Sequence, residues 1–161
     1  MNSEFCVAVH ALVYLDHKAA FVSSEELADN ICTNPARVRK VLARLKAAGL
    51  VETREGSEGG SRFCGRAEAV SLAAVARALD VRFVAAGWRS GDVDKACLVS
   101  SGMGALMDGL LQELNEDCYA KLERQTLADV SRKIFSRDRQ QPGGESPPKA
   151  RAAEAFRTSS L

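Results

Sequence analysis

Residues 34–60 of the chain read NPARVRKVLARLKAAGLVETREGSEGG, and this stretch decides the fold. Asn34 before Pro35 predicts a helix start, because Asn caps free N–H groups and Pro suits the first helical position. The next apolar residues recur at the spacing of one helix face: Val38, Val41, Leu42 and Leu45. Gly49 predicts a left-handed helix end. The stretch therefore begins with a helix that buries one face.

The remainder of the stretch predicts a β-hairpin. Two short strands, Leu50–Arg54 and Ser61–Cys64, are joined by residues 55–60, of which three are glycine. Glycine adopts positive φ without steric cost, so this loop has the composition of a hairpin tip.

Helices are also expected before this stretch. Residues 4–16 carry apolar side chains at intervals of three and four, which predicts a first helix with one buried face. Ser23, with Glu26 three residues later, makes a capping box and predicts a second helix over 24–31. Helix, turn, helix and glycine-tipped hairpin is the order of a winged helix-turn-helix. The predicted fold class is mainly α with a small β-hairpin wing.

Beyond the hairpin, Ser71 predicts a short helix that ends near Leu79, and further helices are expected over residues 100–124 and 126–135. The long helix carries an apolar stripe, which a domain this small cannot cover and which is therefore expected to be the core of a dimer. Its members are Met103, Met107, Leu110, Leu111, Leu114 and Leu122.

The predicted organisation has three parts. Residues 1–79 form the winged helix-turn-helix, and residues 80–135 form a linker and the dimerisation helices. Residues 136–161 hold three of the four prolines and show no sustained periodicity, which indicates a disordered tail.

Charge is unevenly distributed along the chain. Residues 1–33 carry a net charge of −4, and residues 34–66 carry +5. A basic segment after an acidic one is typical of a surface that binds a polyanion. A solvated helix face would give the same pattern, so charge alone leaves both interpretations open.

The cations of the 34–48 helix lie away from its apolar face, with Arg37, Lys40 and Arg44 along one line and Arg39 and Lys46 flanking it. A helix fits the major groove of DNA, where Arg can read guanine and Lys mainly neutralises phosphate. The N-terminal turns usually meet the bases. The expected base contacts are Asn34, Ala36, Arg37 and Lys40, and the expected phosphate contacts further along are Arg44 and Lys46.

The hairpin supplies a second group of expected DNA contacts: Arg54, Arg62, Gly59 and Gly60. Arginines there can enter a minor groove or grip phosphate, and glycines let the backbone approach. Ser24, at the start of the second helix, belongs to the same expected surface, as does Arg39. Glu55 and Glu58 oppose phosphate binding unless they face solvent.

Five segments resemble the Rrf2-type transcriptional regulators: SEELA at 24–28, NP at 34–35, VRKVL at 38–42, LKAAGLV at 45–51 and TRxGxxGG at 53–60. The resemblance covers residues 1–135. It implies homodimers that bind palindromic operators in double-stranded DNA, usually as repressors. Ser61 departs from the pattern, because an aromatic residue is common after the paired glycines.

The cysteines also depart from part of that family. Many members that carry an iron–sulfur cluster hold three cysteines before and within the dimerisation helix. In this chain only Cys97 occupies one of those three positions, and the other two are Met103 and Leu111. Such a cluster needs more thiolates than this segment offers. The chain resembles the cluster-free branch, so no metal and no other cofactor is expected.

Cys97 is the candidate sensor. It precedes the long helix, whose N-terminus can lower the pKa of a thiol and favour the reactive thiolate. The alternative is an inert, buried cysteine. Trp88 offers a rival, since it could be either a packing anchor or part of an effector pocket.

Other classes are excluded or disfavoured. The chain has no phosphate loop, His-Glu metal pair or nucleophile elbow, so no enzyme is predicted. No apolar run is long enough to span a membrane, and the N-terminus lacks a secretory signal, so a cytoplasmic protein is expected. The remaining alternative is a winged-helix protein–protein adaptor that does not bind DNA. That interpretation would favour an anionic recognition helix, whereas this one is basic.

Overall fold

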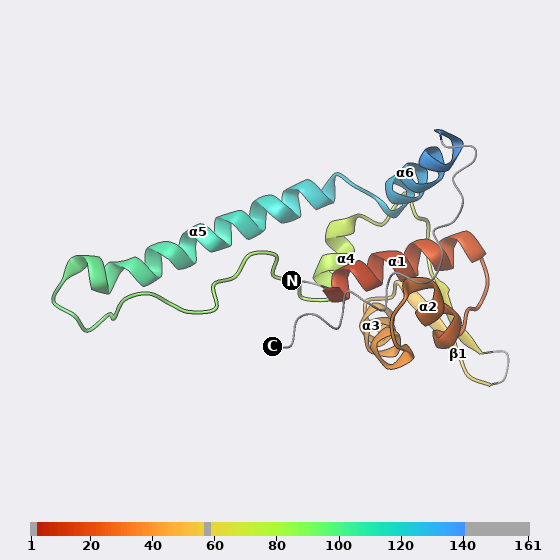
Figure 1. The fold of residues 1–161 in the computed structure, drawn as a ribbon, viewed down its shortest axis with the longest axis horizontal. Coiled ribbons are helices and arrows are strands. Elements are labelled where there is room, and N and C mark those ends of the chain that lie inside the picture. The colour runs from red at the N-terminus through yellow and green to blue at the C-terminus, as the bar shows by residue number, and fades with distance from the viewer. Residues whose placement is uncertain (1–2, 57–58, 141–161) are drawn as a thin grey trace, which may run out of the picture. The chain divides into compact units, whose positions relative to one another are not determined.

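The computed structural model describes residues 3–56 and 59–140, with the backbone alone for 137–140. The elements, shown in Figure 1, are α1 (Ser3–Lys18), α2 (Ser24–Ile31), α3 (Pro35–Ala47), β1 (Val51–Arg54), β2 (Gly60–Phe63), α4 (Leu72–Ala78), α5 (Leu98–Glu123) and α6 (Leu127–Gln140). The chain divides into two compact units, Met1–Ser131 and Arg132–Leu161. The fold class is confirmed: helices with one small antiparallel hairpin.

The helix ends form where the capping residues predict them. The Asn34 side chain accepts a hydrogen bond from the Arg37 N–H at 2.8 Å, and Ser23 and Ser71 cap α2 and α4 in the same way. Each bond satisfies an N–H group that has no partner within its helix. Gly49, just beyond α3, has φ +73°, the left-handed conformation expected of a glycine at a helix end.

The core lies where α1 contacts α2, α3, α4 and β2. Figure 1 shows α2, α3 and the hairpin on one side of α1. The predicted buried face of α3 is confirmed, because Val38, Val41 and Leu45 are fully buried and Leu42 is nearly so. On α1, Leu12 and Leu15 are equally buried. This packing fixes how α3 is rotated about its own axis.

The hairpin is held to the helices by its second strand. Val22, between α1 and α2, exchanges two backbone hydrogen bonds with Ser61, at 2.9 and 2.8 Å. Gly60 has φ +154°, and a Cβ there would lie 2.4 Å from the Val22 carbonyl oxygen. Real Cβ atoms do not approach that closely, so this attachment of the hairpin requires glycine at position 60.

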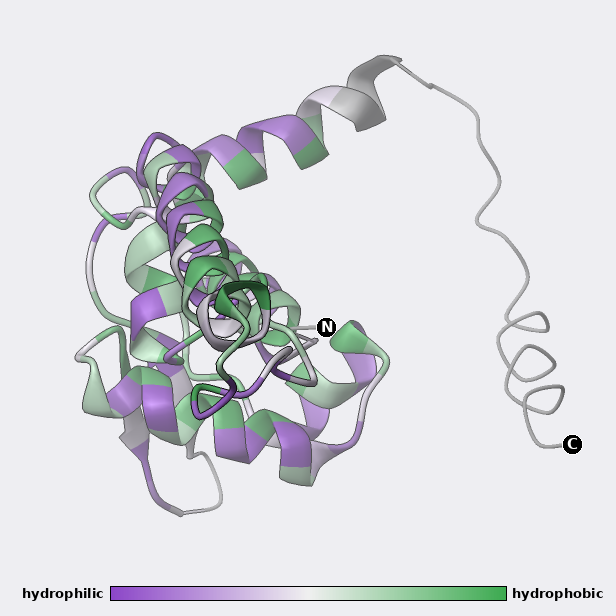
Figure 2. Cartoon of the chain, turned by 90° about the vertical axis from the view of Figure 1, so that its left-hand side faces the viewer, coloured by the Kyte–Doolittle hydropathy of each residue, from purple (hydrophilic) through white to green (hydrophobic). Residues whose placement is uncertain are grey.

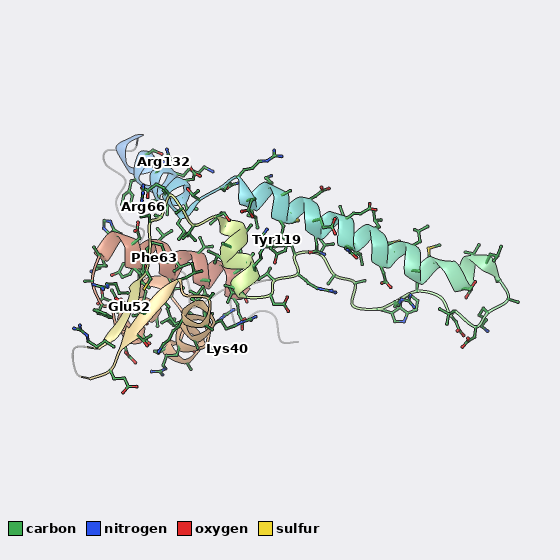
Figure 3. All side chains as sticks on the ribbon, turned by 180° about the vertical axis from the view of Figure 1, so that it is seen from behind. Lys40, Glu52, Phe63, Arg66, Tyr119 and Arg132 are labelled. Atoms are coloured by element: carbon green, nitrogen blue, oxygen red, sulfur yellow. The ribbon has the colours of Figure 1, made fainter. Side chains whose placement is uncertain are left out.

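The segment between α4 and α5, which the sequence left unassigned, contains no helix or strand over residues 80–97. It is held instead by side chains of α5. Tyr119, labelled in Figure 3, donates to the Val81 carbonyl at 2.8 Å, and the Asn115 side chain accepts the Phe83 N–H at 2.8 Å. The Phe83 ring packs edge-to-face against both Phe5 and Tyr119. The segment thus joins α5 to the first turn of α1.

One predicted boundary differs. α6 continues to Gln140, whereas the tail was expected from residue 136. Residues 137–140 are charged or polar without a helix breaker, and a proline follows only at position 142, which restricts residue 141. The rest of the expected tail, residues 141–161, lies outside the described part of the chain.

No helix among the described residues is long and apolar enough to cross a membrane.

Candidate nucleic-acid interface

The cations of α3 divide between two sides of the helix. Because the apolar face is buried, Arg39 and Lys46 lie toward the hairpin, whereas Lys40 and Arg44 lie toward the start of α1. Figure 3 labels Lys40 on α3 and Glu52 on the hairpin. The three cations predicted to lie along one line share the α1 side, and the two predicted to flank that line both lie on the hairpin side.

The first group borders a groove of about 610 Å3 between the start of α2, α3 and the hairpin. Six of the predicted contacts line it: Ser24, Arg39, Lys46, Arg54, Gly59 and Gly60. The Nζ of Lys46 donates to the Thr53 hydroxyl at 2.6 Å, which ties the helix to the hairpin. The structure therefore brings together residues that are far apart in the sequence.

The second group gathers around the first turn of α1. Glu4 accepts from Lys40 at 2.6 Å and lies 3.4 Å from Arg44, while Arg37 donates to the Ser3 hydroxyl. The hydrogen bond from Lys40 lowers the pKa of the Glu4 carboxyl, which is therefore ionised at neutral pH. Three predicted contacts thus already have partners within the chain.

Acidic partners also accompany the groove cation Arg39 and the hairpin cation Arg62. Arg39 lies 3.2 Å from Glu25, and Arg62 pairs with Glu52 across the hairpin. The Arg39–Glu25 side chains are 59% and 66% exposed, so this pair contributes at most about 1 kcal/mol and can open toward another anion. Glu55 lines the groove as well, and Glu58 lies outside the described residues.

Two more predicted contacts have clear positions. Ala36 is exposed in the first turn of α3. The side-chain oxygen of Asn34, an expected base contact, caps the helix by accepting the Arg37 N–H.

Phe21 and Glu4 belong to this surface, and sequence reasoning missed both. The Arg54 guanidinium carbon lies 4.7 Å from the Phe21 ring centroid, and that of Arg62 lies at 4.9 Å. Ser61, which departs from the family pattern, is buried in the backbone bridge to residue 22. An aromatic ring still reaches the wing arginines, from a neighbouring segment.

Comparison with known proteins gives a family. The model of the Rrf2 family, described as "Iron-dependent Transcriptional regulator", matches residues 1–133. YwnA of Bacillus subtilis (strain 168), which carries the name of an HTH-type transcriptional regulator, is 29% identical over 137 residues, covering 84% of this chain and 99% of YwnA.

Solved structures share the fold. A protein of Lactobacillus plantarum superposes with a TM-score of 0.73 at 23% identity, covering 87% of this chain and 98% of that one. CymR, the global cysteine regulator of B. subtilis, superposes with a TM-score of 0.59 at 16% identity, covering 83% and 96%.

Among the residues that the structure describes, no group of three or more His, Cys, Asp or Glu side chains could hold a metal ion. Cys97 is exposed directly before α5, where the Ser100 and Val99 N–H groups lower the pKa of its thiol, although no side chain caps this helix start. Trp88 is 77% exposed and lines an open hollow of about 740 Å3 beside α5.

The Glu4 contacts predict an acid-sensitive contribution to stability. A folded-state pKa below the ordinary 4.5 stabilises the fold above that pH, and the stabilisation is lost as the pH falls through the folded value. Glu4→Gln should lower the free energy of unfolding by less than about 1 kcal/mol at neutral pH, since Lys40 is largely exposed. In stronger acid, where Glu4 is protonated, the substitution should have no effect. Urea unfolding at neutral and at acidic pH measures the difference in stability between parent and variant, with Glu55→Gln as the control. An equal loss of stability at the two pH values would contradict the prediction.

Proposed function

The chain belongs to the Rrf2 family of DNA-binding transcriptional regulators, and from that premise we propose that it represses transcription as a homodimer on a palindromic operator. The groove between α3 and the hairpin is the observation that supports this proposal. It gathers cations from the recognition helix and the wing on one surface. We further propose that the protein acts in the cytoplasm and has no enzymatic activity.

The groove side of α3 suits a duplex. A helix enters the major groove while a hairpin can reach phosphate or the adjacent minor groove. In this arrangement the cations of α3 and of the hairpin leave their exposed carboxylate partners and contact the phosphates or bases of DNA. The proposed contacts are Ser24, Ala36, Arg37, Arg39, Lys40, Arg44, Arg54, Gly59, Gly60 and Arg62, with Asn34 acting mainly as a cap. The first 79 residues form the proposed DNA-binding part.

The apolar surface of α5 supports the dimer. Figure 2 shows hydrophobic and hydrophilic residues interspersed along this helix. Leu111 and Leu122 of the predicted stripe are half-buried within the chain, but its other members remain exposed and Leu106 adds to them. These exposed side chains are Met103, Leu106, Met107, Leu110 and Leu114. A second copy of α5 related by a two-fold axis would cover them.

A protein–protein adaptor without DNA binding is the alternative. Its recognition helix would need a surface complementary to a protein rather than to a polyanion. Arg39 and Lys46, on the groove side of α3, favour DNA.

Arg39→Ala tests the groove. We expect it to weaken binding by about 1–3 kcal/mol on a duplex that the parent protein selects from a random pool, because the groove loses a central cation. Arg77→Ala is a matched control: Arg77 is also 59% exposed and ion-paired, to Glu123 at 2.9 Å, but lies on α4 away from the groove. Fluorescence polarisation at two salt concentrations measures both. Equal losses in the two variants would contradict the assignment.

The double variant Leu110→Glu, Leu114→Glu tests the dimer. Four carboxylates across a two-fold interface repel one another, so we expect monomers with poor operator affinity. Light scattering at micromolar concentration reports the assembly. A parent protein that is monomeric under these conditions would overturn the proposal.

We propose that Cys97 carries the signal. The thiol is exposed and its pKa is lowered, which favours the reactive thiolate. Oxidation would add a polar group where the 80–97 segment joins α5, and a change there can alter the spacing of the two recognition helices.

Peroxide treatment tests this signal. Operator affinity of the parent should fall after oxidation, whereas that of Cys97→Ser should stay constant. Cys118→Ser, which changes a half-buried cysteine of α5, is the control and should respond as the parent does. If parent and Cys97→Ser respond alike, Cys97 is not the switch, and the hollow at Trp88 becomes the better candidate for an effector site.

A further inference from the structure

Phe21 lies on the face of the hairpin that carries the arginines. Val22 is buried and pairs with Ser61 through two backbone hydrogen bonds, as a third strand would. Side chains alternate between the two sides of an extended segment, so Phe21 lies on the side opposite Val22. The same alternation along β2 places Arg62 on the side opposite the buried Ser61. The backbone pairing therefore directs Phe21 and Arg62 to one surface.

Arg54 reaches the same surface because its cross-strand neighbour is Gly60. That glycine is the position at which the hairpin touches the Val22 carbonyl too closely for any Cβ. Arg54 thus faces no side chain across the hairpin, and its guanidinium lies over the Phe21 ring at 4.7 Å. One glycine accounts both for the close approach of residues 21–22 and for the space beside Arg54.

The two arginines on the Phe21 ring differ in their charge partners. Arg62 Nε donates to Glu52 at 2.7 Å, so a carboxylate already balances its charge. Within residues 3–56 and 59–140, no ion pair forms at Arg54. Arg54 is exposed and lines the groove with Arg39 and Lys46. Of the two cations at the ring, Arg54 is the one that can meet an external anion without first releasing a carboxylate.

The contact with the ring leaves the donors of Arg54 usable. A guanidinium contacts an aromatic ring through its flat face, while its N–H groups point outward in the plane and can bond phosphate oxygens in pairs. A free arginine loses much of its rotamer freedom when DNA immobilises it, and an arginine already held on a ring loses less.

We propose that Phe21 is a positioning residue for DNA binding. The Phe21 ring holds Arg54 in the groove, so that the Arg54 guanidinium is already oriented when it contacts the phosphate backbone. This inference rests on the proposed function. It adds a specific role for a residue that carries no charge and makes no hydrogen bond through its side chain.

The test compares Phe21→Leu with Phe21→Tyr on a fluorescein-labelled, mixed-sequence duplex of about three helical turns. Leucine keeps an apolar side chain but lacks the π face, so affinity should fall about threefold. The slope of log affinity against log salt should stay at the parental value, because the number of cations is unchanged. Tyrosine keeps the ring and should retain the parental affinity.

A double-mutant cycle assigns the effect to the arginine. Arg54→Ala should lower affinity and reduce the salt slope by about 0.9, as expected for one lost phosphate contact. In that background Phe21→Leu should have little further effect, because Arg62, the other arginine at the ring, is already held by Glu52. Circular dichroism and light scattering check that fold and assembly are unchanged, and Phe21→Met replaces Phe21→Leu in the cycle if the leucine variant does not fold.

Two results would overturn the inference: parental affinity of Phe21→Leu, or an equal loss with and without Arg54. Failure of the parent protein to bind any duplex would contradict the proposed function instead, so the two failures are distinguishable.

Discussion

Burial of one face of α3 is the constraint on which the interface depends. Val38, Val41 and Leu45 are fully buried, and each such side chain contributes about 1.5–3 kcal/mol. Glu4 of α1 forms ion pairs with Lys40 and Arg44 of α3. These pairs are partly exposed and contribute at most about 1 kcal/mol each. The apolar face therefore decides the rotation of α3, and the charged contacts adapt to it. That rotation in turn determines which cations lie toward the hairpin.

A second constraint places the hairpin. The two hydrogen bonds between Val22 and Ser61 attach β2 to the segment that also caps α2 through Ser23. Gly60 makes the close approach possible. Because the same few residues fix the start of α2 and the loop end of β2, Ser24, Arg39 and the hairpin come to border a single groove. Backbone geometry therefore determines the proposed DNA-binding surface and the direction in which its charged side chains lie.

Local signals in the sequence predicted the elements, and long-range contacts determined the site. Asn34, Pro35 and Gly49 act within one helix turn of themselves, so their roles could be inferred directly. Spacing along α3 separated its two groups of cations, but the neighbours that each group faces depend on contacts with distant segments, and so does the position of Phe21. Glu26 shows where local signals stop being sufficient. Its backbone N–H donates to the Ser23 side chain, as the capping box predicts, but its carboxylate accepts from the Tyr14 hydroxyl of another helix.

Hydrogen–deuterium exchange with and without a duplex selected by the protein tests the central claim most directly, because it locates the DNA without altering any residue. The account predicts slower exchange in the start of α2, in α3 and in the hairpin strands, with little change in α4. Protection confined to α4 or to the exposed side of α5, with α3 and the hairpin unchanged, would contradict it.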